Sequence, residues 1–429
     1  MSQYTGYHGD SLEFLKSNQI VVGDFVEILT DIVHSGIIMP RFEHNDDKHI
    51  VIKLKNGYNI GLEIEKVEKV EKSTVPDKII KINEGVKRNE KIPNILLLST
   101  GGTIASKIDY RTGAVTPILT AEELNSSVPE LNTIANIDAK VLFSEYSENI
   151  MPEHWLKIAE TVKNHFESDY SGIIIAHGTD TMHYTSAYLS FSLAGFPIPI
   201  ALVGSQRSSD RASSDAALNL IGAAKFLTKC KTNGVYVVMH QDENDETIAC
   251  HIGTRVRKNH TSKRGAFQTV GDKPAFSVMN DKVSANSKTS FFTTKKFEPK
   301  IKINEKVALV KYHPGYEPKM LKNMIDSGYK AIIFEGTGLG HIGKNMYSVV
   351  KMAHEKGIFM GMTSQCIDGR VRMTVYESGR DLLDLGIIPL ENMIPEVALV
   401  KSMWVTGNTE NYTEIKEIMT NRIASEFST

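Results

Sequence analysis

The stretch "ILLLSTGGTIASK", from Ile95 to Lys107, joins a buried-strand pattern to a loop in which threonines flank two glycines. Its first five residues suit a buried strand. Gly101 and Gly102 would let the backbone approach a ligand closely and would leave amide N–H groups free for a developing oxyanion. The hydroxyl of Thr100 or Thr103 could instead cap a helix by accepting a backbone N–H. The stretch therefore predicts a strand that ends either at a ligand site or at a capped helix.

Apolar strands and helical patterns alternate from Ile95 to the end of the chain. This alternation is typical of an α/β fold with mostly parallel sheets. The expected strands are 95–99, 140–143, 172–177, 198–205, 234–240, 306–312, 330–336 and 359–365, and the expected helices include 152–166, 181–195 and 213–229. The polar region around 280–305 has no periodicity, so we expect a domain boundary there.

The segment from Val21 to about Val70 has short β-rich runs separated by turns. Asn56-Gly57 between alternating apolar residues is a strong hairpin signal. We interpret this segment as a small β-barrel of the SH3 type. The expected domains are a barrel over 1–75, a linker over 76–91, a larger α/β domain over 92–285, a linker over 286–304 and a smaller α/β domain over 305–429.

Composition limits the class of protein. A chain of 429 residues is too long for one ordinary core, and 41% hydrophobic with 23% charged residues is typical of a globular protein. A net charge of −2 provides no overall field for nucleic acid. The three widely spaced cysteines fit neither a disulfide framework nor a zinc knuckle, and the start of the chain has no signal-peptide pattern. We therefore expect a cytoplasmic protein.

Residues 186–204 carry no charge over about the length of a membrane span. Gly195, Pro197 and Pro199 interrupt this stretch. Its first half is typical of the end of a helix, and its second half is typical of a buried strand. We therefore expect no membrane helix here.

A second polar loop, "HGTDTMH" from His177 to His183, follows another expected strand. Loops at the carboxyl ends of parallel strands converge on the ligand crevice of an open α/β sheet. Nucleophilic catalysis would explain hydroxyls in both loops. Asp180 as the N-cap of the next helix would explain this loop alone, but the two loops together favour catalysis.

The segments "TGGTIA" (100–105) and "HGTDTM" (177–182) resemble the two signature segments of the L-asparaginase/glutaminase family. A third segment, "RKNHTSKRGAFQ", places Lys258 nine residues before Phe267, as the lysine of that family stands before its aromatic residue. The resemblance covers roughly residues 92–425. It implies an asparaginase-like two-domain α/β core and hydrolysis of a side-chain amide.

The resemblance also implies roles for individual residues. Thr103 matches the nucleophile of the family, and Tyr110 in "DYRTG" matches the tyrosine of the lid loop. Thr179, Asp180 and Lys258 match a second constellation of hydroxyl, carboxylate and lysine. A threonine hydroxyl is a weak nucleophile until a neighbouring group withdraws its proton, and a lysine partly neutralised by burial could relay that proton.

Ser147 and Glu148, in "EYSENIMP", match the substrate-binding segment of the family. The carboxylates of Asp180 and Glu148 suit the α-ammonium group of an amino acid. Two positions differ from many secreted bacterial members. Glu148 replaces a glutamine, and Leu339 stands where they have an amide side chain. The preference between glutamine and asparagine therefore stays open.

About 90 residues precede the first signature segment, whereas free-standing asparaginases begin close to it. A barrel containing "GDFVEI" and "SGIIMPR" ahead of an asparaginase core resembles the family of D subunits of archaeal glutamyl-tRNA(Gln) amidotransferases. That resemblance implies glutamine hydrolysis, possibly also asparagine hydrolysis, to supply ammonia for converting Glu-tRNA(Gln) to Gln-tRNA(Gln). It implies no cofactor in this chain, and a partner, the E subunit, that binds tRNA(Gln) and uses ATP with Mg²⁺. A homodimer of this chain within a heterotetramer is also implied.

Two other functions compete with this interpretation. One is a stand-alone cytoplasmic L-asparaginase. The other is a dinucleotide-binding protein, because Gly338, Gly340 and Gly343 match the G-x-G-x-x-G fingerprint between a strand and a helix. That fingerprint also requires an acid at the end of the next strand, and the sequence has none until Asp368. A metal site is not expected, because no pair of histidines has the spacing of helical ligands.

Overall fold

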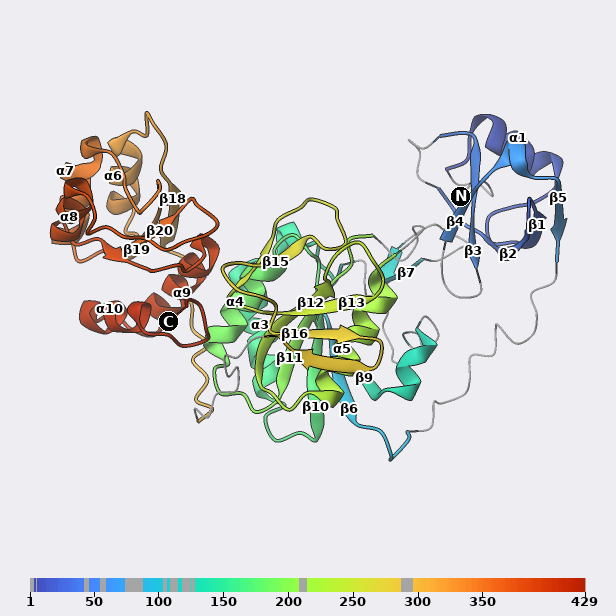
Figure 1. Ribbon diagram of the computed structural model, residues 1–429, viewed down its shortest axis with the longest axis horizontal. Coiled ribbons are helices and arrows are strands. Elements are labelled where there is room, and N and C mark those ends of the chain that lie inside the picture. The colour runs from blue at the N-terminus through green and yellow to red at the C-terminus, as the bar shows by residue number, and fades with distance from the viewer. Residues whose placement is uncertain are drawn as a thin grey trace.

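The protein is described by a computed structural model that covers residues 4, 6–41, 46–54, 59–73, 88–102, 106–108, 115–117, 124, 128–207, 214–286 and 296–428. Figure 1 shows three bodies in a row: an N-terminal unit, a larger α/β unit and a smaller α/β unit at the C-terminal end.

The N-terminal unit is a five-stranded antiparallel sheet with one helix against it. Its elements are α1 (Gly9–Ser17), β1 (Phe25–Leu29), β2 (Val33–Ile38), β3 (His49–Leu54), β4 (Asn59–Glu63), the 3-10 turn η1 (Ile64–Lys66) and β5 (Lys69–Lys72). The strand order is β4-β3-β2-β1-β5. Asn56-Gly57 lie outside the described residues, but β3 and β4 on either side pair antiparallel, so the predicted hairpin is confirmed. Closure of this sheet into a barrel stays a prediction.

The larger unit is built on an eight-stranded sheet in the order β17-β16-β13-β12-β11-β10-β6-β9. The strands are β6 (Asn94–Ser99), β9 (Asn136–Val141), β10 (Tyr170–Ala176), β11 (Pro199–Val203), β12 (Gly234–His240), β13 (Thr247–Ile252), β16 (Phe276–Met279) and β17 (Lys282–Ala285). The five from β12 to β9 in this order are parallel, and the remaining three pair antiparallel.

Helices cover both faces of this sheet. They are α3 (Pro152–Lys163), α4 (Met182–Ser192) and α5 (Ala216–Lys229). Leu96 and Leu98 of β6 pack with α3 and α4, whereas Ile95 and Leu97 pack with α5. Burial on both faces explains why these strands are continuous apolar runs rather than alternating patterns. Shorter elements of this unit are β7 (Ser106–Ile108), β8 (Val115–Pro117), η3 (Pro129–Thr133), η4 (Ser147–Asn149), β14 (Val256–Lys258) and β15 (Phe267–Thr269).

The smaller unit is a four-stranded parallel sheet, β18 (Val307–Lys311), β19 (Ala331–Gly336), β20 (Phe359–Ser364) and β21 (Ile388–Pro389). Its other elements are α6 (Pro318–Asp326), η5 (Lys344–Met346), α7 (Tyr347–Glu355), α8 (Glu377–Asp384), α9 (Pro395–Asn408) and α10 (Tyr412–Thr420). Helix α9 packs against both this sheet and α4, with Trp404 stacked on Phe191 at 5.7 Å between ring centroids. One apolar core therefore runs from the larger unit into the smaller one.

The strand expected at 140–143 is misplaced. The strand β9 covers Asn136–Val141, because it pairs residue by residue with β6 from Asn94↔Asn136 to Ser99↔Val141. The uncharged stretch 186–204 divides as expected, since α4 ends at Ser192 and β11 begins at Pro199. Over the described part of the chain, no helix has the length and apolar character that crossing a membrane requires.

Candidate active site

The two threonine-containing loops lie side by side, because β6 and β10 are neighbours in the sheet and Ser99 pairs with Ala176. Thr100 donates its backbone N–H and its hydroxyl to the Ala176 carbonyl at 3.0 and 2.9 Å. Its side chain is buried. Thr100 therefore fixes the end of β6 against β10. Thr103 and Tyr110 lie outside the described residues.

Gly101 and Gly102 occupy positions that a side chain could not share. Their φ angles are +106° and +79°. A Cβ on Gly101 would stand 2.4 Å from the Glu145 carbonyl oxygen, and one on Gly102 would stand 2.8 Å from the Gly178 nitrogen. The glycines therefore let this loop lie directly against the loops that follow β9 and β10. These close approaches are to neighbouring loops, and close approach of this backbone to a ligand stays a prediction.

Thr179, Asp180 and Lys258 come together at the same edge of the sheet. The Lys258 ammonium donates to Thr179 Oγ1 at 2.8 Å and to Asp180 Oδ1 at 2.6 Å. Only 9% of the lysine side chain is exposed, against 64% of the aspartate side chain. Lys258 ends β14, where it pairs across the strand with the buried Phe267 of β15. The nine-residue spacing seen in the sequence is thus the span of a β-hairpin.

Ser147 lies beside this group, whereas Glu148 faces outward. The buried Ser147 hydroxyl accepts the Asp180 backbone N–H at 3.3 Å and lies 3.4 Å from Asp180 Oδ2. The Thr181 hydroxyl donates to the Ser147 carbonyl at 2.6 Å. Glu148 is exposed on η4. The structure therefore joins Ser147 to the predicted group directly.

The two histidines of the "HGTDTMH" loop are buried and uncharged. His177 Nδ1 donates to the Gly178 carbonyl at 2.6 Å, and its Nε2 accepts from the Thr185 hydroxyl at 2.9 Å. Burial lowers the pKa of His177 to about 4. Burial, helped by the nearby Arg257 and Lys258 cations, also lowers the pKa of His183 to about 4. Within the described ranges, no group of three or more His, Cys, Asp or Glu side chains is arranged to hold a metal ion.

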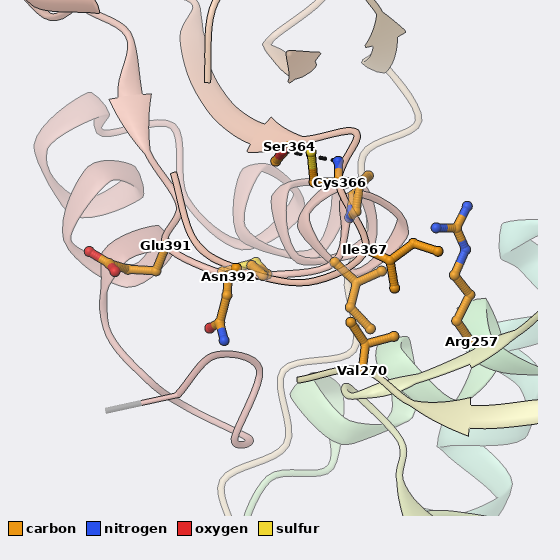
Figure 2. A pocket seen from close by; sticks show the side chains of 11 residues that line it. Arg257, Val270, Ser364, Cys366, Ile367, Glu391 and Asn392 are labelled. Atoms are coloured by element: carbon orange, nitrogen blue, oxygen red, sulfur yellow. Dashed lines mark hydrogen bonds between the residues drawn. The ribbon is translucent and has the colours of Figure 1, made fainter. Parts of the chain in front are cut away.

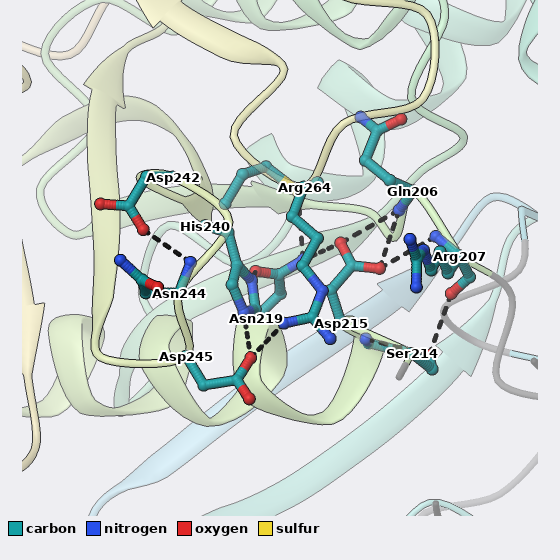
Figure 3. Close-up of polar contacts among 12 residues, drawn as sticks. Gln206, Arg207, Ser214, Asp215, Asn219, His240, Asp242, Asn244, Asp245 and Arg264 are labelled. Carbon is teal, nitrogen blue, oxygen red and sulfur yellow. Dashed lines mark hydrogen bonds and ion pairs between the residues drawn. The ribbon is translucent and has the colours of Figure 1, made fainter. Parts of the chain in front are cut away.

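A buried polar network, shown in Figure 3, adjoins this site, and no sequence motif indicated it. The buried Asp215 carboxylate accepts the N–H groups of Gln206 and Arg207 at 2.9–3.0 Å. The Asn219 amide donates to Asp215 Oδ2 at 3.0 Å, and its oxygen lies 2.6 Å from His240 Nδ1. Gln206 and Arg207 follow β11, Asp215 and Asn219 lie at the start of α5, and His240 ends β12, so only the folded sheet brings them together.

A pocket lies where the larger and smaller units meet, and Figure 2 shows side chains of both units around it. Arg257, the neighbour of Lys258, lines this pocket and forms an ion pair with Glu396 of α9 at 3.1 Å. The other lining residues include Val270, Ser364, Cys366, Ile367, Glu391 and Asn392. The strand that ends at Lys258 is therefore connected to the smaller unit through Arg257.

Local geometry accounts for the three glycines of the loop 338–343. Gly338 and Gly340 have φ angles of +51° and +100° in a turn closed by the bond from Thr337 N–H to the His341 carbonyl at 2.9 Å. A Cβ on Gly343 would stand 2.3 Å from the Tyr312 hydroxyl oxygen. These glycines are explained by the turn and its packing, without a dinucleotide.

Family comparisons divide the chain in the same order as the structure. The family described as "Asparaginase, N-terminal" matches residues 94–291, and "Glutaminase/Asparaginase C-terminal domain" matches 306–419. Ahead of both, "GatD N-terminal domain" matches residues 20–72. A stand-alone asparaginase core does not account for that third match.

Comparison with curated proteins covers nearly the whole chain. The D subunit of the glutamyl-tRNA(Gln) amidotransferase of Sulfolobus acidocaldarius is 44% identical over 98% of this chain and 95% of its own length. The chain belongs to the family of glutamyl-tRNA(Gln) amidotransferase D subunits. The D subunit of Methanopyrus kandleri is 45% identical over 99% of this chain and 95% of its own.

Comparison with solved structures gives this chain an asparaginase-like fold. The thermostable L-asparaginase from Thermococcus kodakarensis superposes with a TM-score of 0.69 and 33% identity, over 78% of this chain and 99% of that one. A probable cytoplasmic L-asparaginase from Campylobacter jejuni gives 0.65 and 26%, over 77% and 100%. The two-domain α/β fold predicted from the signature segments is confirmed.

Proposed function

We propose that this protein is the glutaminase subunit of a tRNA-dependent amidotransferase. It hydrolyses the side-chain amide of glutamine and supplies ammonia for the conversion of Glu-tRNA(Gln) to Gln-tRNA(Gln). The Lys258–Thr179–Asp180 group carries this proposal, because it places a hydroxyl, a carboxylate and a lysine in contact at the carboxyl edge of an asparaginase-like sheet. Membership of the D-subunit family supports glutamine as the substrate and a reaction linked to tRNA.

We assign the nucleophile to Thr103. Its oxygen attacks the amide carbon, the carbon–nitrogen bond breaks, and nitrogen leaves as ammonia once it has received a proton. Water then hydrolyses the resulting ester to give glutamate and the free threonine. Tyr110 closes over the reacting atoms from the following segment.

Thr179 and Lys258 form the proton-transfer pair in this proposal. The 2.8 Å contact lets a proton pass between the Thr179 hydroxyl and the lysine nitrogen. Asp180 holds the lysine, and its exposed carboxylate, with that of Glu148, attracts the substrate α-ammonium group. Ser147 orients Asp180 through the contacts at 3.3 and 3.4 Å.

The assembly follows from the same assignment. A partner, the E subunit, binds tRNA(Gln) and uses ATP with Mg²⁺, while this chain holds no cofactor. This chain forms a homodimer within a heterotetramer in the cytoplasm. Its domains are the N-terminal unit (1–75), the larger α/β domain (92–285) and the smaller one (305–429), joined by linkers at 76–91 and 286–304.

The test is ammonia release from glutamine and from asparagine, by the chain alone and with the partner and Glu-tRNA(Gln). We expect glutamine hydrolysis to rise at least about tenfold when both are added, a coupling of about 1.4 kcal/mol. Thr103→Ala and Thr179→Ala should each reduce the rate below about a tenth of wild type without unfolding the chain. Equal and high rates on asparagine under every condition would identify an ordinary asparaginase instead.

A further inference from the structure

The position of Lys258 depends on a hairpin that has little sheet of its own. Strands β14 and β15 pair over only three residues each, and an eight-residue loop, 259–266, joins them. A two-stranded hairpin of this length is marginally stable in water without further packing. Contacts beyond the hairpin must therefore set where the lysine nitrogen lies.

The tip of the hairpin is anchored to the loop between β12 and β13. Arg264, of which 11% of the side chain is exposed, forms an ion pair with Asp245. A Cβ on Gly265 would stand 2.7 Å from Asp242 Cα, so the two loops touch through their backbones. Asp245 Oδ1 also lies 3.5 Å from Nε2 of the fully buried His240, at the end of β12.

From His240 the chain of contacts continues toward Thr179. His240 Nδ1 lies 2.6 Å from Asn219 Oδ1, and the Asn219 amide donates to the Gly204 carbonyl at 3.0 Å. A Cβ on Gly204 would stand 2.8 Å from the Thr179 methyl carbon, so this backbone lies directly against Thr179. This series of contacts thus holds the hairpin of Lys258 at one end, through Arg264, and supports Thr179, the hydroxyl partner of Lys258, at the other end.

The hydrogen bonds determine which nitrogen of His240 carries the proton. Asn219 Nδ2 donates to Asp215 and to Gly204, so Asn219 Oδ1 is the acceptor and His240 Nδ1 must donate. In a neutral ring Nε2 then has no proton, so its 3.5 Å approach to Asp245 Oδ1 is a packing contact rather than a hydrogen bond. Burial lowers the pKa of His240 against the opposing charges of Asp215 and Asp245, and Arg264 lowers it further.

We propose that His240 is a positioning residue for amide hydrolysis, one that keeps the Lys258 nitrogen within hydrogen-bonding distance of Thr179. Its hydrogen bond to Asn219 supports Gly204 and Thr179 on one side, and on the other side its ring packs against Asp245, whose ion pair with Arg264 holds the hairpin of Lys258. We refer to Arg264, Asp245, His240 and Asn219 as the positioning network. The inference rests on the proposed amide hydrolysis, because the Lys258–Thr179 contact has a catalytic role only in that reaction.

The first experiment compares His240→Leu, which removes the donor to Asn219, with His240→Asn, whose amide nitrogen can take the place of Nδ1. Tyr236→Phe is the matched control, because it removes a buried hydroxyl that donates at 2.9 Å to Asn233 at the opposite end of β12. We expect His240→Leu to lower kcat by about tenfold to a hundredfold, as displacement of a catalytic group does, with KM changed less than about threefold. His240→Asn should stay within about threefold of wild type.

The second experiment is hydrogen exchange of residues 256–269, which does not depend on activity. His240→Leu should speed exchange of this hairpin, and Tyr236→Phe should not. If His240→Leu does not fold, Arg264→Gln at the more accessible tip of the hairpin tests the same inference with both readouts. A His240→Leu enzyme that is less stable but keeps wild-type kcat and hairpin protection would overturn the inference. If wild type hydrolyses neither amide, the proposed function fails, and the exchange result still decides whether the network holds the hairpin.

Discussion

Buried neutral histidines in the larger unit should make the protein sensitive to acid. Burial lowers the pKa of His251 to about 3 and the pKa values of His177 and His183 to about 4, from an ordinary 6.5. As the pH falls below 6.5, the unfolded chain binds protons that the folded chain does not. The contribution of these histidines to the free energy of unfolding is therefore full above pH 6.5, decreases between pH 6.5 and about pH 3–4, and is lost below that range.

The expected loss can be measured by urea unfolding at pH 7, 6, 5 and 4. A shift from 6.5 to about 4 corresponds to about 3 kcal/mol for His177 alone. His251→Gln should flatten the pH dependence, and His313→Gln, at an exposed position, should not. A free energy of unfolding that stays constant from pH 7 to pH 4 would contradict this prediction.

Sequence motifs located some residues of the candidate site and missed others for a physical reason. Thr179, Asp180 and Lys258 stand in segments whose residue types recur together, and they meet as expected. His240 and Arg264 belong to no local pattern, because their contact runs through Asp245 between two loops. Only the order of strands in the sheet brings such residues together.

Among the elements, the loop after β6 should tolerate substitution least. Gly101 combines a φ of +106° with a position where a Cβ would stand 2.4 Å from the Glu145 carbonyl oxygen. Gly315 provides a matched control, because its φ is +84° but its Cβ would meet nothing within 4 Å. Both changes to alanine carry backbone strain, and only Gly101→Ala also forces two loops apart.

We expect Gly101→Ala to lose about 2 kcal/mol more of unfolding free energy than Gly315→Ala. It should also reduce amide hydrolysis, since Thr103 follows two residues later. Urea unfolding of both variants with wild type measures the difference. Equal losses would mean that the loop after β9 moves aside without cost.

The bounds of a strand can be predicted from the sequence where burial sets them, and less well where pairing with a neighbouring strand sets them. The strand 234–240 was predicted at its observed bounds, because seven largely apolar residues fill a sheet covered on both faces. The predicted start of β9 is four residues too late, because the observed start is set by pairing with Asn94 rather than by the sequence of the strand itself. Closure of the N-terminal sheet likewise depends on pairing that the apolar pattern does not specify.

At the scale of the whole molecule, the C-terminal segment connects the two α/β units. The Thr254 hydroxyl of the larger unit donates to the Ala424 carbonyl at 2.6 Å, and Arg255 donates to the Glu426 carbonyl at 3.3 Å. Lys401 of α9 holds the same segment from the other side through its ion pair with the Glu426 carboxylate at 2.5 Å. The orientation of the two units therefore depends on where this segment lies.

Lys401→Met should be strongly destabilising. Neither side chain of the Lys401–Glu426 pair is exposed, so the change leaves a buried carboxylate without its cation. Breaking a buried pair in this way typically costs about 3–5 kcal/mol. Three backbone contacts to the carboxylate, from the N–H groups of Ile423 and Ala424, remain in the variant but do not neutralise its charge.

The double variant Lys401→Met/Glu426→Leu should recover part of that loss, because replacing both members removes the buried charge. Lys322→Met breaks the exposed pair with Asp326 and should cost less than about 1 kcal/mol. Urea unfolding of the three variants gives the free energies, and limited proteolysis reports whether residues 421–428 have come away. If Lys401→Met unfolds like Lys322→Met and its C-terminal segment stays protected, the pair does not hold the two units together.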